Sequence, residues 1–137
     1  FEELAGMFEA KEVDFSALEA SDDLQYGTAD GRGFAVGGGV AQAVVNYIKD
    51  KYPDREVKVA SAQGLADCKK MLMLAKAGKY NGYLLEGMGC PGGCIAGAGT
   101  LADPARTATL LTKYKKDAPI QHSADSDFKD YGKLLHD

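Results

Sequence analysis

Apolar residues recur every three or four positions in several stretches of the chain, which is typical of helices with one buried face. Asp103 is a suitable N-cap for the last of these stretches, and Pro104 suits a first helical turn. Pro53 ends the second stretch and Gly78 ends the third. The pattern therefore predicts helices that contain residues 4–8, 40–48, 65–75 and 106–116.

Two further stretches have the pattern of strands. Residues 56–61 alternate polar and apolar positions, and residues 83–85 are a short apolar run. A helix is predicted between them, and the order strand, helix, strand implies a crossover that joins parallel strands. The chain is therefore predicted to have an α/β fold with a small parallel sheet flanked by helices. Residues 21–33 are predicted to be a loop, and residues 126–136 a last short helix.

The predicted helix over 65–75 indicates which side chains face the core. Leu65, Cys68, Leu72 and Ala75 recur at helical spacing and are predicted to form its buried stripe. Cys68 is therefore interpreted as a packing residue. His122 and His136 lie in polar sequence near the C-terminus, and both are predicted to be solvated rather than catalytic.

Composition and charge exclude several classes of partner. The 137 residues, 45% of them hydrophobic, predict a single domain over residues 1–137. The net charge of -4 disfavours nucleic acid, and no apolar run approaches the ~18 residues of a membrane span. Three cysteines without a secretory signal favour a reducing, cytoplasmic location. Because the chain opens at Phe1 directly into a predicted helix, we expect a fragment of a longer protein.

The candidate chemistry lies in residues 86–99, which read Glu-Gly-Met-Gly-Cys-Pro-Gly-Gly-Cys-Ile-Ala-Gly-Ala-Gly. Cys90 and Cys94 are four positions apart in a glycine-rich loop. Glycine lacks a Cβ, so the backbone of such a loop can approach a bulky group closely. Thiolates are preferred ligands of soft metals and iron–sulfur clusters. The loop also follows a predicted strand directly, and open α/β sheets place ligands beyond the carboxyl ends of their strands.

Other interpretations of the thiol pair stay open. Cys90 and Cys94 are also compatible with a tight turn that holds two unreactive thiols. A metal-free redox pair that closes reversibly into a disulfide is a further alternative. A structural zinc site is less favoured, because it usually takes its four ligands from repeated cysteine pairs and no second pair occurs here.

The glycine triplet 37–39 opens the second predicted helix and has two interpretations. A glycine-rich turn at a helix N-terminus is suited to bind an anion or a phosphate. Residues 31–36 do not complete a Gly-x-Gly-x-x-Gly motif, however, and no Gly-Lys-Ser/Thr follows. Close packing of this helix against the thiol loop explains the glycines equally well.

Residues 86–99 resemble the last of the three signature motifs of the iron-only (FeFe) hydrogenases. That motif runs roughly Glu-x-Met-Ala-Cys-x-Gly-Gly-Cys-x-x-Gly-Gly-Gly. Residues 33–40 resemble the glycine-rich entry to a helix that precedes the motif in this family. Residues 3–15 resemble another helix of the same family. The matches occur in order and cover most of the chain.

The resemblance implies a role for each residue of the loop. Cys90 would bind the 4Fe–4S cubane of the H-cluster, and Cys94 would bind the cubane and bridge it to a two-iron subsite. Met88 would line the pocket of that subsite. The glycines that would leave space for the cluster are Gly92, Gly93 and Gly97.

The family reaction implied by the resemblance is the reversible reduction of protons to dihydrogen. The family's other ligand motifs, similar to Thr-Ser-Cys-x-Pro and Pro-Cys-x-x-Lys-x-Glu, do not occur in this chain. The chain is therefore expected to be the C-terminal lobe of a two-lobed catalytic domain, inactive and without cofactor when isolated. The implied partners are the N-terminal remainder of that domain and an electron carrier such as ferredoxin.

Departures from the motif keep an alternative open. Gly89 and Ala98 replace the family's usual Ala and Gly, and Thr100 with Leu101 replaces its usual Gln-Pro. These differences are compatible with a hydrogenase-like iron–sulfur sensor or a cluster-assembly protein.

Overall fold

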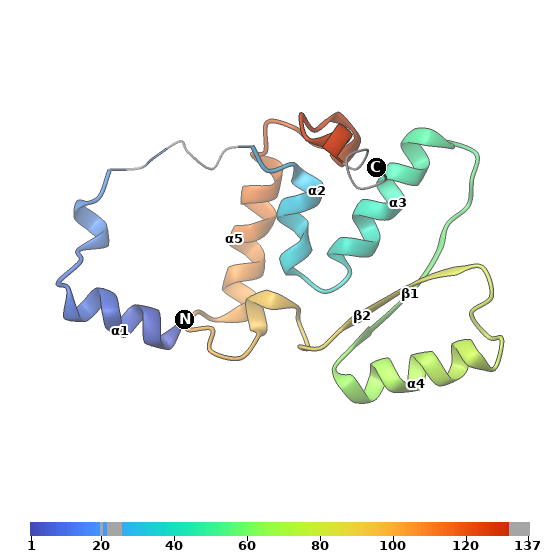
Figure 1. The fold of residues 1–137 in the computed structure, drawn as a ribbon, viewed down its shortest axis with the longest axis horizontal. Coiled ribbons are helices and arrows are strands. Elements are labelled where there is room, and N and C mark those ends of the chain that lie inside the picture. The colour runs from blue at the N-terminus through green and yellow to red at the C-terminus, as the bar shows by residue number, and fades with distance from the viewer. Residues whose placement is uncertain (20, 22–25, 132–137) are drawn as a thin grey trace.

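The structure is a computed structural model that describes residues 1–19, 21 and 26–131 (Figure 1). This described part combines α-helices with a two-stranded parallel sheet, which confirms the predicted α/β class. The helices are α1 (Glu2–Ala10), α2 (Ala29–Arg32), α3 (Gly39–Lys51), α4 (Leu65–Lys76) and α5 (Pro104–Lys116), and the strands are β1 (Lys58–Gln63) and β2 (Tyr83–Met88).

The parallel sheet brings the end of β1 next to the end of β2. The two strands pair from Lys58 opposite Tyr83 to Gln63 opposite Met88, and α4 connects them and packs on both. Gly64 N then donates to the Met88 carbonyl at 2.8 Å, which extends the pairing past the last strand residue. The strands predicted at 56–61 and 83–85 are therefore confirmed. The first begins and ends two residues later than predicted, and the second extends three residues further, to Met88.

The predicted buried stripe of α4 is wrong at two positions. Leu65 is 78% exposed and Leu72 is 60% exposed, whereas Met71 is buried. Cys68 and Ala75 are half-buried, as a position facing the sheet requires. A sheet of two strands covers only a narrow face of the helix, and this face is centred between Cys68 and Met71. Leu65 and Leu72 lie about a quarter-turn away from its centre.

Helices α2, α3 and α5 form a second packed layer beside the sheet (Figure 1). Of the loop predicted over 21–33, residues 22–25 lie outside the described residues, and the prediction is wrong from residue 29, where α2 begins. The Thr28 side chain caps this short helix by accepting a hydrogen bond from Gly31 N at 3.0 Å. Arg32 ties α2 to α5, because its guanidinium lies 3.9 Å from the ring centroid of Tyr114 and donates to the Tyr114 carbonyl at 2.7 Å. Helix α5 begins as predicted, with the Asp103 carboxylate accepting from Arg106 N at 2.8 Å.

The buried carboxylate of Asp30 links the segment around Ser123, after α5, to α2 and α3. Asp30 is 3% exposed and accepts hydrogen bonds from Asn46 Nδ2 at 2.6 Å and from Ser123 N at 3.0 Å. His122 Nδ1 lies 3.8 Å from Asp30 Oδ2 and 3.7 Å from Asp50 Oδ2, and the imidazole is 45% exposed. His122 is thus partly exposed between two carboxylates rather than freely solvated.

The last predicted helix falls only partly within the described residues. Residues 126–131 contain turns and a 3₁₀ segment but no α-helix. His136 and the rest of the predicted helix lie outside the described residues.

Large apolar side chains remain on the surface of the described part of the chain. No side chain there is fully buried, and the buried apolar residues are mostly small: Ala29, Ala41, Ala43, Val45, Ala62, Met71 and Ala118. Phe1 and Leu101, by contrast, are 76% and 64% exposed. No helix within the described ranges is long and apolar enough to cross a membrane.

Candidate functional site

The two thiols of the glycine-rich loop lie directly after β2. Cys90 is half-buried and Cys94 is exposed, and neither is in a disulfide. Gly93 N donates to the Cys90 carbonyl at 3.1 Å, which closes a tight turn between the thiols. A single 3₁₀ turn over Cys94–Ala96 follows. The loop therefore presents both thiols at the carboxyl end of the sheet, where the sequence predicts a site.

The loop backbone packs directly on the segment that precedes α3. Gly92 and Gly93 have φ angles of +89° and +83°, a region that favours glycine. A Cβ on Gly93 would lie 2.6 Å from the Ala35 carbonyl oxygen and 2.7 Å from Gly37 N. The packing interpretation of the glycine-rich turn thus holds for Gly37, which lies against the thiol loop. A Cβ on Gly39 would likewise overlap the Gly33 carbonyl.

Gly97 lies next to one of the two thiols. A Cβ on this residue would lie 3.6 Å from Cys90 Sγ and 3.3 Å from the Cys94 carbonyl oxygen. Gly93 and Gly97 therefore differ in use. The first allows two backbone segments to touch, and the second lies beside the Cys90 sulfur, where a Cβ would make an ordinary contact with the sulfur and a tighter one with the Cys94 carbonyl.

The N-terminus of α3 binds the carboxylate of Glu86, a side chain of this same chain. Glu86 Oε1 accepts hydrogen bonds from Val40 N and Ala41 N, both at 3.1 Å. Ser61 Oγ lies 3.3 Å from Glu86 Oε2, and the glutamate is only 8% exposed. A carboxylate at a helix N-terminus is stabilised by the helix dipole and by unpaired N–H groups. The sequence signal for this role is one charged residue within the apolar strand β2.

Two other residues named from the sequence lie beside the loop. Met88 is half-buried, and its carbonyl accepts from Gly64 N, while Cys68 Sγ lies 3.5 Å from the same oxygen. Cys68 Sγ is also 3.6 Å from the Ala62 carbonyl, so this thiol packs between α4 and the sheet. Cys68 is therefore half-buried as a packing residue, as the sequence predicts.

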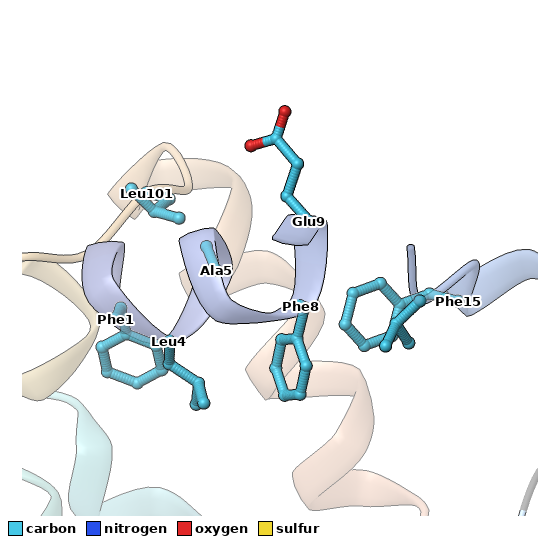
Figure 2. A pocket seen from close by; sticks show the side chains of 8 residues that line it. Phe1, Leu4, Ala5, Phe8, Glu9, Phe15 and Leu101 are labelled. Carbon is cyan, nitrogen blue, oxygen red and sulfur yellow. The ribbon is translucent and has the colours of Figure 1, made fainter. Parts of the chain in front are cut away.

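An apolar hollow of about 410 Å³ adjoins Cys94. The residues around it are Phe1, Ala35, Cys94, Ile95, Thr100, Leu101, Ala102 and Thr107. Met88 is not among them. A second hollow, of about 360 Å³, lies along α1, where Figure 2 shows the Glu9 carboxylate pointing away from the rings of Phe8 and Phe15. Phe1 and Leu101 line both hollows, so the two form a continuous apolar surface next to the exposed thiol.

The donor set of the loop fits part of an iron–sulfur site. Within the described ranges, no group of three or more His, Cys, Asp or Glu side chains is placed to hold a metal ion. The loop itself offers two soft thiol donors, and iron–sulfur clusters commonly take four cysteine ligands. The Cys90 and Cys94 thiols can therefore serve as a partial set that a second set of ligands completes.

Comparison with known proteins identifies the family. The family described as "Iron only hydrogenase large subunit, C-terminal domain" matches residues 1–98. The chain is 30% identical to the "Periplasmic [Fe] hydrogenase large subunit" of Nitratidesulfovibrio vulgaris over 80% of its own length and 34% of that protein. It is 29% identical to the "NADP-reducing hydrogenase subunit HndD" of Solidesulfovibrio fructosivorans over 71% of its own length and 21% of that protein.

The chain thus spans between a fifth and about a third of the length of these relatives. The family match includes α1, the glycine-rich turn before α3, the sheet and both thiols of the loop. On this match, the chain belongs to the iron-only hydrogenase large subunits, in the region of their C-terminal domain.

Proposed function

We propose that this chain provides two cysteine ligands, Cys90 and Cys94, to the H-cluster of an iron-only hydrogenase. The observation that carries the proposal is the thiol pair itself. Both thiols lie on a backbone-packed loop at the carboxyl end of the sheet, in a chain that belongs to this family. When bound, the cluster supplies the redox chemistry for the reversible reduction of protons to dihydrogen.

The two thiols take different roles in this proposal. Cys90 is half-buried beside Gly97, which suits a ligand of the 4Fe–4S cubane alone. Cys94 is exposed and adjoins the apolar hollow, which suits a thiolate that also bridges to the two-iron subsite. The family resemblance implies that Met88 lines the pocket of that subsite, although Met88 does not line the hollow beside Cys94. Gly92, Gly93 and Gly97 would let the loop backbone approach the cluster closely, and Gly93 in addition packs on residues 35–37.

The remaining ligands come from the N-terminal remainder of the same catalytic domain. Two thiols are half of a common cluster ligand set, and the relatives are three to five times longer than the matched region. The apolar surface around Phe1 and Leu101 is the face that this remainder covers. We propose that the isolated chain is inactive, and that the complete protein exchanges electrons with a carrier such as ferredoxin.

The location of the complete protein stays a prediction. The cysteine content favours a reducing, cytoplasmic compartment, and one relative is named a periplasmic subunit.

The experiment compares single cysteine variants of the full-length protein. Cys90→Ser and Cys94→Ser are each expected to lower bound iron and to abolish hydrogen evolution. Cys68→Ser is the matched control, because this thiol packs between α4 and the sheet and should leave both quantities unchanged. Iron is measured per protein chain after anaerobic cluster reconstitution.

Three results would contradict the proposal. Full iron content in both loop variants would show that the loop holds no cluster. A reversible loss of about two hydrogens in mass on mild oxidation, with no iron bound, would favour a thiol redox module. Iron that depends on both thiols, without hydrogen turnover, would favour a sensor.

A further inference from the structure

Gln63, the last residue of β1, lies where three segments meet. Its side-chain oxygen accepts a hydrogen bond from Gly92 N at 2.6 Å. A Cβ on Gly37 would lie 2.6 Å from Gln63 Nε2, so the same amide group also rests on the glycine-rich turn before α3. One side chain therefore contacts both the turn and the loop that carries the thiols.

The next residue reinforces this attachment. Gly64 N donates to the Met88 carbonyl at 2.8 Å, just before the loop. A Cβ on Gly64 would lie 3.7 Å from Pro91 Cγ, so Pro91 packs over the end of β1. Gly92 lies two residues after Cys90 and two before Cys94, and its amide is tied to a different strand rather than to the loop itself.

We propose that Gln63 is a positioning residue for the thiol pair. By holding the Gly92 amide, it fixes the turn that places the Cys90 sulfur beside Gly97 and leaves Cys94 exposed. Metal ligands bind best when neighbouring hydrogen bonds set their positions beforehand. That this positioning serves metal binding rests on the proposed cluster function. The hydrogen bond between Gly92 N and Gln63 involves protein atoms only and does not require a metal.

The test removes the acceptor from Gln63 and keeps its length. In the metal-free protein, Gln63→Met is expected to raise the hydrogen-exchange rate of the Gly92 amide about tenfold, as the loss of one hydrogen bond predicts. The alkylation rate of Cys90 by iodoacetamide should rise about threefold or more, because its turn loosens, while the exposed Cys94 changes less. Gln42→Met is the matched control, since the Gln42 amide only donates to Asn46 Oδ1 at 2.8 Å on the surface of α3.

Cys68 serves as an internal probe of the fold. Its thiol lies between two carbonyls of the sheet region and should react at an unchanged rate in Gln63→Met. An equal acceleration at Cys68 would overturn the proposal, because the effect would then be a general loss of structure. Unchanged Gly92 exchange or unchanged Cys90 alkylation would overturn it as well.

A rescue variant isolates the acceptor. Gln63→Glu keeps an oxygen that can accept from Gly92 N, so exchange at Gly92 should stay within about threefold of the unmodified protein. Exchange as fast as in Gln63→Met would overturn the role assigned to the acceptor. All of these measurements are made without iron, so their failure is distinguishable from failure of the cluster proposal, which the iron content of the cysteine variants tests.

Discussion

Gly93 is the residue at which the thiol loop and the turn before α3 touch. A side chain there would meet the Ala35 carbonyl and would have to adopt a φ of +83°. We expect Gly93→Ala to lower the free energy of unfolding by about 2–4 kcal/mol, from backbone strain and overpacking together. Urea unfolding of the metal-free protein measures this.

Gly89 provides the control for that substitution. A Cβ on Gly89 would meet nothing within 4 Å, and its φ is outside the left-handed region. Gly89→Ala should therefore change the free energy of unfolding by less than about 1 kcal/mol. A large loss in this control would show that any side chain in the loop is harmful, whatever its contacts.

Glu86 joins β2 to the first turn of α3. Glu86→Ala would leave Val40 N and Ala41 N without their acceptor and should cost about 2–4 kcal/mol of stability. Glu86→Gln keeps an acceptor oxygen and loses only the charge, so it should cost about half as much. Equal losses in the two variants would contradict a role for the hydrogen bonds.

At the scale of residues, the thiol loop could be predicted from the sequence, but the side chains that hold it and the neighbouring helix α3 in place could not. Cys90 and Cys94 could be identified because their motif is contiguous in the sequence. Gln63 lies 29 positions from its partner Gly92, and Glu86 lies 46 positions from Val40. Such contacts depend on how the strands pair, which no local pattern contains.

Among the elements, the segment after α5 depends on Asp30 for its attachment to α2 and α3. Asp30→Ala would leave Asn46 Nδ2 and Ser123 N without an acceptor and should lower stability by about 2–3 kcal/mol. Asp50→Ala is the control, because that carboxylate is 40% exposed and lies only near His122. Its loss should cost less than about 1 kcal/mol in the same urea titration.

Apolar periodicity predicted the positions of the helices more reliably than it predicted which face of a helix is buried. α3, α4 and α5 occur where apolar spacing predicts them, and Asp103 caps α5 as expected. The stripe of α4 was misplaced because Leu65 and Leu72 are apolar and yet exposed. Periodicity finds the apolar face of a helix, but a sheet of two strands does not cover all of that face.

For the whole molecule, the exposed apolar surface is the main departure from an ordinary globular domain. The isolated chain is expected to bind a hydrophobic fluorescent dye, and Leu101→Ser should lower that fluorescence because Leu101 lines both hollows. Leu72→Ser is the control, since Leu72 is similarly exposed at 60% and lines neither hollow. Equal effects of the two substitutions would contradict a localised docking face.

The junction at Gly93 has a consequence for protein engineering. Main-chain atoms of the loop and of residues 35–37 form this contact, so the junction itself needs no particular side chain, and Gln63 adds one side-chain contact to it. A peptide of residues 86–99 alone would lack residues 35–37, against which the loop packs. Transplanting the thiol pair into a designed protein therefore requires three segments grafted together as one unit: the loop, the glycine-rich turn before α3, and the end of β1 with Gln63.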